Sequence, residues 1–373
     1  MKVVTLVGTR PELIKLSLTI AELDRQVEHR LVHTGQNYDF ELNEVFFRDL
    51  GIRKPDHFLD AAGENAAHTI GNVIARADEV LAKENPEALL LLGDTNSCLA
   101  AISAKRRKIP VFHMEAGNRC FDQRVPEEIN RKLVDHLSDI NLPYTEHARR
   151  YLLAEGMKPE TVIKTGSPMR EVLAHYLPQI ERSRTVEDLQ LTSGGYFVVS
   201  AHREENIEPE VNFSRLVATL NAIAEKYGRS IIVSTHPRTQ KRLDALEPSR
   251  FSQQIRFLKP LGFLDYVKLQ MHAYCVLSDS GTLTEESSIL AFPAVMIREA
   301  HERPEGMDEA TLIMSGLDRE RVIEAIDVAV AHYQDNPRPF KLAPDYDTEN
   351  LARKVLRIIL SYTDYVNRTV WRK

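Results

Sequence analysis

Three acidic residues have positions that suit proton-transfer chemistry. Asp94 follows the apolar run 88–92, Glu115 follows the apolar run 111–113, and Glu127 opens a helical stretch. A lone acid at such a place is more often a helix cap or a surface charge than a catalyst. Carboxylates held close together, however, shift one another's pKa values and can divide the roles of acid and base. We therefore take the trio as candidates for general acid–base catalysis.

In the second half of the chain, basic residues follow two apolar runs. His202 and Arg203 come after the run 196–200, and His236 comes after the run 231–235. Either histidine alone is more often a structural or a surface residue. Two basic clusters at the ends of apolar runs indicate an anionic ligand instead.

A third cluster, Ser280-Gly281, lies at the start of a helical stretch that also contains Glu286. Backbone N–H groups at a helix start bind phosphate, and an acid one to two turns later can accept hydrogen bonds from ribose hydroxyls. The alternative is that Ser280 caps the helix, and the two roles are compatible.

Two arginines stand where a diphosphate ligand would need them. Arg10 precedes Pro11, a residue typical of a helix start, and Arg303 follows the apolar run 294–297. Guanidinium groups match pyrophosphate oxygens bidentately. Surface ion pairs, such as one between Arg10 and Glu12, are the alternative.

Motifs for common cofactors are missing from the sequence. Neither a G-x-G-x-x-G fingerprint nor a P-loop occurs, which argues against tightly bound NAD. There is also no H-E-x-x-H, no cysteine pair and no carboxylate-metal motif, so we expect neither a metal nor another cofactor.

The elements that must position these residues are short apolar strands alternating with helices. Near-continuous apolar runs are typical of parallel strands that are covered on both faces, and this order predicts doubly wound α/β sheets. Ligands of such sheets bind outside the carboxyl ends of the strands, where the candidate residues lie. The predicted strands are 3–7, 29–33, 88–92, 111–113, 162–165, 196–200, 231–235, 274–278 and 294–297, and the main predicted helices are 11–23, 69–83, 127–137, 213–227 and 348–366.

The chain is predicted to form two domains that face each other across a cleft. Its 373 residues are enough for two or three domains at ~150 residues each. A polar stretch, 181–195, separates the two sets of strands. We expect a first Rossmann-like domain at 1–170 with the catalytic carboxylates and a second at 171–349 with the nucleotide site. The C-terminal helix, 350–373, is expected to pack back on the first domain.

Composition excludes several classes of partner. With 48 Lys and Arg against 54 Asp and Glu, the net charge of −6 argues against nucleic-acid binding. The three cysteines are far apart in the chain, which fits a reducing compartment. No apolar run approaches the ~20 residues that span a bilayer. We therefore expect a cytoplasmic protein without nucleic-acid or membrane partners.

Six motifs, in order, resemble those of the non-hydrolysing UDP-N-acetylglucosamine 2-epimerases, over essentially the whole chain. They are G-T-R-P-E at 8–12, G-D-T at 93–95, E-A-G-x-R at 115–119, P-E-E-x-N-R at 126–131, D-S-G at 279–281 with E-E at 285–286, and E-R-P-E at 302–305. The resemblance implies the type B glycosyltransferase architecture of two Rossmann-like domains with a nucleotide between them. It also implies a UDP-sugar substrate and, commonly, a homodimer.

The resemblance also implies a set of site residues. Its catalytic positions are Asp94, Glu115, Glu127 and His202, and its substrate-binding positions are Arg10, Lys15, Arg119, His236, Ser280, Gly281, Glu286 and Arg303. We expect Asp94 and Glu115 to have opposite proton-transfer duties and Glu127 to orient or tune them. We expect His202 to assist near the departing phosphate.

The chain departs in several places from the better-known members of the family, and these departures indicate one branch of it. They occur at 34–39, 117–121, 203–206, 281–282 and 300–303. In these places the chain is similar to the branch that converts UDP-2-acetamido-2,6-dideoxy-L-talose to UDP-N-acetyl-L-fucosamine for capsule and O-antigen synthesis. Conversion of UDP-GlcNAc to UDP-ManNAc is the alternative reaction, and a type B glycosyltransferase is the alternative from a different enzyme class.

Overall fold

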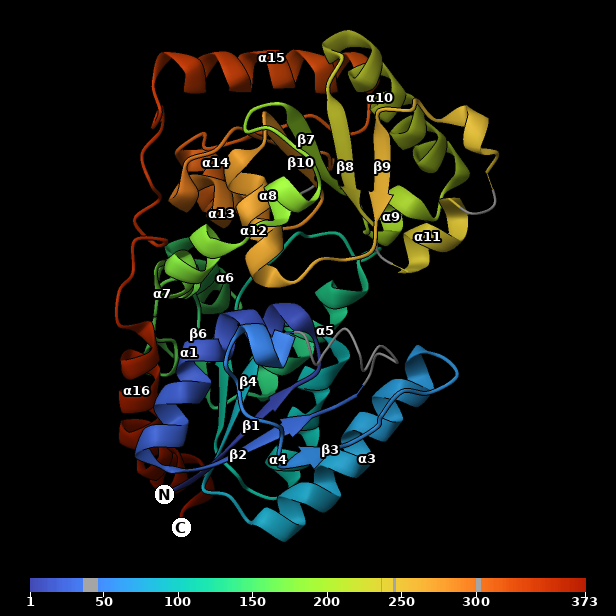
Figure 1. Cartoon of the computed structure of the whole chain (residues 1–373). Helices are drawn as coiled ribbons and strands as arrows, with labels where there is room; N and C mark the ends of the chain where they lie inside the picture. Colours follow the sequence, from blue (N-terminus) through green and yellow to red (C-terminus); the bar gives the residue numbers. More distant parts are fainter. Residues whose placement is uncertain (36–45, 236, 244–245, 300–302) are drawn as a thin grey trace. The chain divides into compact units, whose positions relative to one another are not determined.

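The structure, a computed structural model, describes residues 1–35, 46–235, 237–243, 246–299 and 303–373. The chain divides into two compact units (Figure 1). The first unit consists of Met1–His175 and Pro344–Lys373, and the second of Tyr176–Ala343. The sequence analysis predicts domain limits at 170/171 and 349/350, and these stay a prediction.

The first unit is built on a six-stranded parallel sheet of order β3-β2-β1-β4-β5-β6. Its two central strands, β1 and β4, are buried almost throughout, which explains their apolar sequences. The order changes direction between these two strands, and doubly wound sheets bind ligands at such a switch point. The strands are β1 (Lys2–Val7), β2 (Glu28–His33), β3 (His57–Phe58), β4 (Ala88–Leu92), β5 (Val111–Met114) and β6 (Ile140–Leu142).

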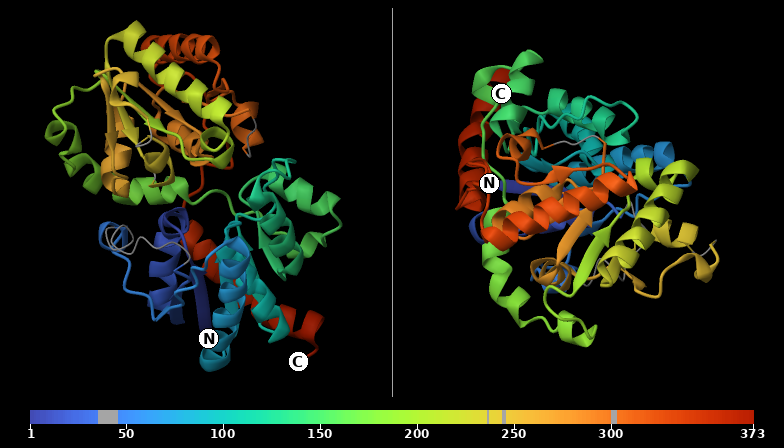
Figure 2. Two further views of the ribbon diagram at one scale, coloured as in Figure 1. Left: turned by 90° about the vertical axis from the view of Figure 1, so that its right-hand side faces the viewer. Right: turned by 90° about the horizontal axis from the view of Figure 1, so that it is seen from above.

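Helices cover both faces of this sheet (Figure 2). They are α1 (Arg10–Gln26), α3 (Ala66–Glu84), η1 (Asn96–Ala100), α4 (Ala101–Arg106), α5 (Pro126–Leu137), α6 (Glu146–Ala154), η2 (Pro159–Thr161), α7 (Met169–Arg182), α16 (Leu351–Val366) and η4 (Asn367–Trp371), of which α7 continues into the second unit. The C-terminal helix α16 lies beside α1 and buries Val355, Ile359 and Val366 (Figure 1). Both chain termini therefore lie in the first unit.

The second unit repeats the same topology. Its parallel sheet has the order β12-β11-β10-β7-β8-β9, in which β7 and β10 take the central places of β1 and β4. The strands are β7 (Tyr196–Ser200), β8 (Ser230–Ser234), β9 (Ile255–Leu258), β10 (Cys275–Ser278), β11 (Ala294–Met296) and β12 (Ile313–Met314). The helices are α8 (Thr185–Asp188), α9 (Glu204–Ile207), α10 (Glu210–Tyr227), α11 (Pro237–Leu243), η3 (Pro248–Arg250), α12 (Phe263–His272), α13 (Thr282–Leu290), α14 (Pro304–Asp308) and α15 (Arg319–Asp335).

The predicted α/β class with two doubly wound sheets is confirmed, but one predicted strand is wrong. The segment 162–165 makes only a single bridge, between Asn141 and Val162, and the sixth strand of the first sheet is β6. Short edge strands such as β3, β6, β9 and β12 carry too few apolar residues to be distinguished from loops by pattern. Within the described residues, no helix is both long and apolar enough to span a membrane.

The start of α1 is tied to the loop after β4 through a buried carboxylate. Glu12 is 2% exposed, and its carboxylate accepts hydrogen bonds from the backbone N–H groups of Gly8 (2.5 Å) and Thr9 (3.3 Å). It also accepts one from the hydroxyl of Thr95, 2.5 Å away. The alternative of a surface pair between Arg10 and Glu12 is therefore wrong. Burial raises the pKa of Glu12 to about 7, although these hydrogen bonds oppose the shift.

The Glu12→Gln variant should weaken the pH dependence of stability. Between pH 4.5, the ordinary pKa of a glutamate side chain, and about pH 7, the folded protein keeps a proton on Glu12 that the unfolded chain has lost. The unfolding free energy of the wild type should therefore fall as the pH rises through this window, by up to about 3 kcal/mol from this residue. Urea unfolding at pH 5 and pH 8, followed by the fluorescence of Trp371, measures the difference between wild type and variant. Equal pH dependence in the two proteins would contradict the prediction.

Candidate active site

Two of the candidate carboxylates follow neighbouring strands of the first sheet. β1, β4 and β5 are adjacent, and Leu92 of β4 is in register with Met114 of β5. Asp94 and Glu115 follow these two residues almost directly, and Gly8 follows β1. Because all three strands are parallel, the residues after them lie along one edge of the sheet.

Glu115 is a half-buried residue whose carboxylate pairs with a buried cation. Its Oε2 lies 2.6 Å from Nζ of Lys15 on α1, and the two side chains are 9% and 7% exposed. The side-chain amide of Asn118 donates to Oε1 over 3.3 Å. Glu115 also has a φ of +62°, a strained conformation for a residue with a side chain and one that clusters at functional sites. Lys15, predicted to bind substrate, thus contacts one of the predicted catalytic residues.

Asp94 is paired in the same way with an arginine. Its Oδ2 lies 2.8 Å from Nη2 of Arg131 on α5, whose side chain is 3% exposed, whereas Asp94 itself is 23% exposed. The side-chain amide of Asn130 donates to the backbone carbonyl of Asp94 over 3.0 Å. Arg131 and Asn130 belong to the P-E-E-x-N-R motif, but sequence reasoning assigned them no role.

The first turn of α5 contains two acids with different surroundings. Glu127, the predicted catalytic residue, is half-buried. Its neighbour Glu128 is fully buried and accepts hydrogen bonds from the backbone N–H of Cys120 (3.1 Å) and from Arg131 (3.2 Å). Glu128, which sequence reasoning missed, therefore orients the arginine that contacts Asp94.

Arg119, predicted to bind substrate, is a buried arginine with two carboxylate partners. Its side chain is 0% exposed. The guanidinium donates to Glu155 over 2.8 and 2.6 Å and to Asp135 over 2.7 Å. With these two carboxylates as partners, Arg119 connects the loop after Glu115 to α5 and to the end of α6, and its predicted contact with substrate stays a prediction.

Arg10 lies at the first residue of α1 and is half-buried. Its guanidinium carbon is 5.5 Å from the centroid of the Phe46 ring. A helix N-terminus and a guanidinium at the same place favour an anionic ligand, and the binding role of Arg10 stays a prediction.

In the second unit, His202 and Asp279 form a pair at adjacent strand ends. Ser200, the last residue of β7, is in register with Ser278, the last residue of β10. His202 follows the first of these strands and Asp279 the second. Nδ1 of His202 lies 3.1 Å from Oδ1 of Asp279, and its backbone N–H donates to Oδ2 over 2.9 Å. His202 is 39% exposed and Asp279 is buried.

The surroundings of Asp279 keep it ionised. Burial by itself would raise the pKa of Asp279, but His202 and the backbone N–H of Arg203 hold that pKa below its usual value. A carboxylate facing Nδ1 favours the tautomer protonated on that nitrogen, which leaves Nε2 as the atom that can exchange a proton with a ligand. The predicted site includes the serine and the glycine of the D-S-G motif but not its aspartate, Asp279.

The start of α13 carries no side-chain cap. Gly281 is the N-cap residue, and the hydroxyl of Ser280 shares a hydrogen bond with the hydroxyl of Thr282 over 3.0 Å. The alternative that Ser280 caps this helix is therefore wrong. The first N–H groups of a helix lack intrahelical acceptors, so this end suits a phosphate.

Two further predicted residues lie close to α13. Glu286, on this helix, is 9% exposed and accepts a hydrogen bond from the side chain of Gln270 over 2.8 Å. Arg303 is also buried, and its Nε is 3.6 Å from a carboxylate oxygen of Glu285. His236 lies outside the described residues, as do the departures at 36–39 and 300–302.

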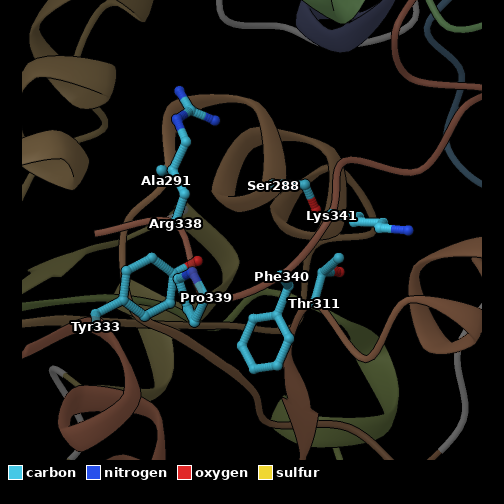
Figure 3. A pocket seen from close by; sticks show the side chains of 8 residues that line it. All are labelled: Ser288, Ala291, Thr311, Tyr333, Arg338, Pro339, Phe340 and Lys341. Atoms are coloured by element: carbon cyan, nitrogen blue, oxygen red, sulfur yellow. The ribbon is translucent and has the colours of Figure 1, made fainter. Parts of the chain in front are cut away.

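Metal-binding clusters and surface hollows do not indicate a second site in the described ranges. No group of three or more His, Cys, Asp or Glu residues in the described ranges is arranged to hold a metal ion. Figure 3 shows a shallow hollow near the C-terminal end of α13, with none of the predicted site residues in its lining. The hollow is lined by Ser288, Ala291, Thr311, Tyr333, Arg338, Pro339, Phe340 and Lys341.

Comparison with known proteins places these features in a family. The family model described as UDP-N-acetylglucosamine 2-epimerase matches residues 21–360. A solved structure of UDP-N-acetylglucosamine 2-epimerase from Rickettsia bellii is 57% identical, with a TM-score of 0.94 and full coverage of both chains. The structure of the Methanocaldococcus jannaschii UDP-GlcNAc 2-epimerase, in complex with UDP-GlcNAc and UDP, is 31% identical, with a TM-score of 0.89 over 97% of this chain and 100% of that one.

A relative with a different named substrate matches over a similar length. The UDP-2,3-diacetamido-2,3-dideoxy-D-glucuronate 2-epimerase of Pseudomonas aeruginosa is 32% identical over 87% of this chain and 91% of its own length. All three proteins are therefore named as 2-epimerases of UDP-sugars, but their names give different sugars. The chain belongs to the UDP-N-acetylglucosamine 2-epimerase family of isomerases.

Proposed function

We propose that this protein inverts carbon 2 (C2) of a UDP-linked 2-acetamido sugar by elimination and re-addition of UDP. The observation that carries the proposal is the pair of carboxylates, Asp94 and Glu115, at adjacent strand ends, each beside its own buried cation. Inversion removes a proton from one face of C2 and delivers a proton to the other face. Two separate acid–base groups meet this requirement, and one would not.

The chemistry follows from the weak acidity of the C2–H bond, which is not next to a carbonyl. A base takes the C2 proton while the bond between C1 and the diphosphate oxygen breaks, and both bonding electrons leave with UDP. The product is a 2-acetamidoglycal with a C1=C2 double bond. An acid then protonates C2 from the opposite face, and the diphosphate oxygen attacks C1 again. No electrons are gained or lost overall, which agrees with a chain that lacks the dinucleotide fingerprint.

The proposal gives each unit a separate task. In the first unit, Asp94 and Glu115 transfer the two protons, Glu127 orients or tunes them, and Arg10 meets the negative charge of the leaving group. The buried cations Lys15 and Arg131 lie beside the two carboxylates and hold them in place at the sheet edge.

In the second unit, the proposal assigns groups to the nucleotide. The start of α13 at Ser280-Gly281 and the guanidinium of Arg303 stabilise the departing diphosphate. Glu286 accepts hydrogen bonds from the ribose, and Nε2 of His202 assists near the phosphate because Asp279 holds the other ring nitrogen.

Two sugars are supported by different observations. The departures within 203–206 and at 281–282 support UDP-2-acetamido-2,6-dideoxy-L-talose, which would become UDP-N-acetyl-L-fucosamine for capsule and O-antigen synthesis. The names of the Rickettsia bellii and Methanocaldococcus jannaschii proteins support UDP-GlcNAc as the second candidate. We propose the 6-deoxy-L-sugar as the substrate and a homodimer as the assembly.

Deuterium incorporation tests the reaction class. With a UDP-sugar substrate in D₂O and no acceptor, the wild type should place one deuterium at C2 of the recovered UDP-sugar, because the proton added at C2 comes from a group in exchange with solvent. NMR and mass spectrometry of the recovered nucleotide sugar measure this. A glycosyltransferase would leave C2 protonated, so unlabelled substrate across a panel of UDP-2-acetamido sugars would refute the proposal.

Substrate preference tests the branch. NMR progress curves with UDP-GlcNAc and with the 6-deoxy-L-talose derivative, at equal concentrations, should show faster conversion of the 6-deoxy sugar. A sugar that fits the pocket is held closer to the reacting geometry, and this difference appears in kcat/KM. Faster conversion of UDP-GlcNAc would replace the proposed substrate by the second candidate and leave the epimerase activity in place.

The Asp94→Asn variant tests the acid–base assignment. It should lower kcat by about 100- to 10,000-fold, the usual contribution of a general acid–base group, while binding of UDP measured by calorimetry changes little. Asp78→Asn is a matched control, because Asp78 also pairs with an arginine, Arg107 at 2.6 Å, but lies on α3 at the surface. The control should retain wild-type kcat. Near-normal turnover of Asp94→Asn would remove Asp94 from the assignment.

A further inference from the structure

Next to the turns of Asp94 and Glu115, three buried ionisable groups, His113, Arg119 and Asp135, form a network that also includes the exposed Glu155. Asp135, on α5, is 0% exposed and lies 2.9 Å from Nδ1 of His113 and 2.7 Å from Nη1 of Arg119. Arg119 in turn pairs with Glu155. Asp135 is absent from the predicted site, and the acid–base chemistry above gives it no part.

One arm of this network reaches the turn that carries Asp94. Nε2 of His113 lies 2.7 Å from the backbone carbonyl of Gly93, an oxygen that can only accept, so this nitrogen carries a proton. The other ring nitrogen faces the carboxylate of Asp135. Burial alone would lower the pKa of His113, but Asp135 and the Gly93 carbonyl raise that pKa above its ordinary value. His113 thereby links the two groups: its ring forms a close ion pair with Asp135, and its Nε2 donates to the carbonyl of Gly93.

The other arm reaches the turn that carries Glu115. The backbone N–H of Gly117 points at both oxygens of Asp135 over 3.2 Å. Gly117 has a φ of +82°, and a Cβ atom here would lie 2.4 Å from the carbonyl oxygen of Ala148, so only glycine fits. With Glu115 at a φ of +62°, the turn is strained and needs external contacts to persist.

We propose that Asp135 is a positioning residue for the epimerase reaction, because one carboxylate holds the turn of Asp94 through His113 and the turn of Glu115 through Gly117. The role rests on the proposed function. Proton transfer requires the acid–base atoms to lie within about 2.6–3.2 Å of the reacting group. A displacement of about 1 Å in either turn costs about 100-fold in rate.

The Asp135→Asn variant tests this role. Asparagine has nearly the same shape but replaces one acceptor oxygen by a donor group beside two cationic donors, His113 and Arg119. We expect kcat to fall about 100-fold, while KM changes less than about threefold because Asp135 touches no part of the proposed nucleotide site.

Asp139→Asn is the matched control, because Asp139 is a buried carboxylate at the opposite end of β5. It accepts a hydrogen bond from the backbone N–H of Val111 over 2.9 Å and lies 2.5 Å from Nζ of Lys105. This variant should lower the melting temperature to a similar extent and retain kcat within about twofold of the wild type. Loss of kcat in both variants, in proportion to their loss of stability, would show that Asp135 is merely structural and overturn the proposal.

A second pair of variants examines the His113 arm alone. His113→Gln keeps an N–H that can reach the Gly93 carbonyl, and His113→Leu does not. We expect the glutamine variant to retain at least about tenfold more kcat than the leucine variant at similar melting temperatures. Equal kcat in the two variants would remove this arm from the proposal.

Hydrogen exchange separates failure of the positioning role from failure of the proposed function. In the Asp135→Asn variant, backbone exchange should be faster in peptides that cover 93–95 and 115–117, and in Asp139→Asn it should be faster around Val111. This readout needs no turnover. A wild type that labels no UDP-sugar in D₂O refutes the epimerase function, whereas unchanged exchange at both turns refutes the role of Asp135 even when the wild type is active.

Discussion

An ionised carboxylate is stable inside a protein only beside a cation or several hydrogen-bond donors, and this requirement shapes the candidate site. Glu115 has Lys15 and Asp94 has Arg131, so each acid is held by a cation from a different helix, α1 or α5. Those helices must therefore start at fixed places on the sheet edge. Asp135, which is fully buried, also has cationic partners, because it lies beside His113 and Arg119.

The sheet topology brings these charges together. In both units the two central strands are neighbours in the sheet but distant in the sequence. The residues that follow these two strands therefore meet at the edge formed by the carboxyl ends of the strands. In the first unit this places Glu12, after β1, within hydrogen-bond distance of Thr95, after β4. In the second unit it places His202, after β7, beside Asp279, after β10. The same edge of the first sheet also carries Asp94 and Glu115, the acid–base residues of the proposed reaction.

Sequence patterns located the candidate residues because apolar strands and polar strand ends alternate so regularly in this fold. They did not determine which member of an adjacent pair faces inward. Glu127 and Glu128 are adjacent acids in the motif, but the structure buries Glu128, which accepts a hydrogen bond from Arg131, and leaves Glu127 half-buried. Arg119 fits the pattern of a ligand-binding arginine, but two carboxylates from α5 and the end of α6, Asp135 and Glu155, enclose it.

The sequence by itself determined the α/β class, the main strands and helices, and the motifs of the epimerase family, because these depend on local periodicity and on short spacings. The tertiary structure decided which charges meet. The pairs Lys15–Glu115, Arg131–Asp94 and His202–Asp279 join residues that are far apart in the chain, so no spacing rule reports them. Their contact energy depends on burial and on distances of about 3 Å, and both arise only when the sheets and helices have packed.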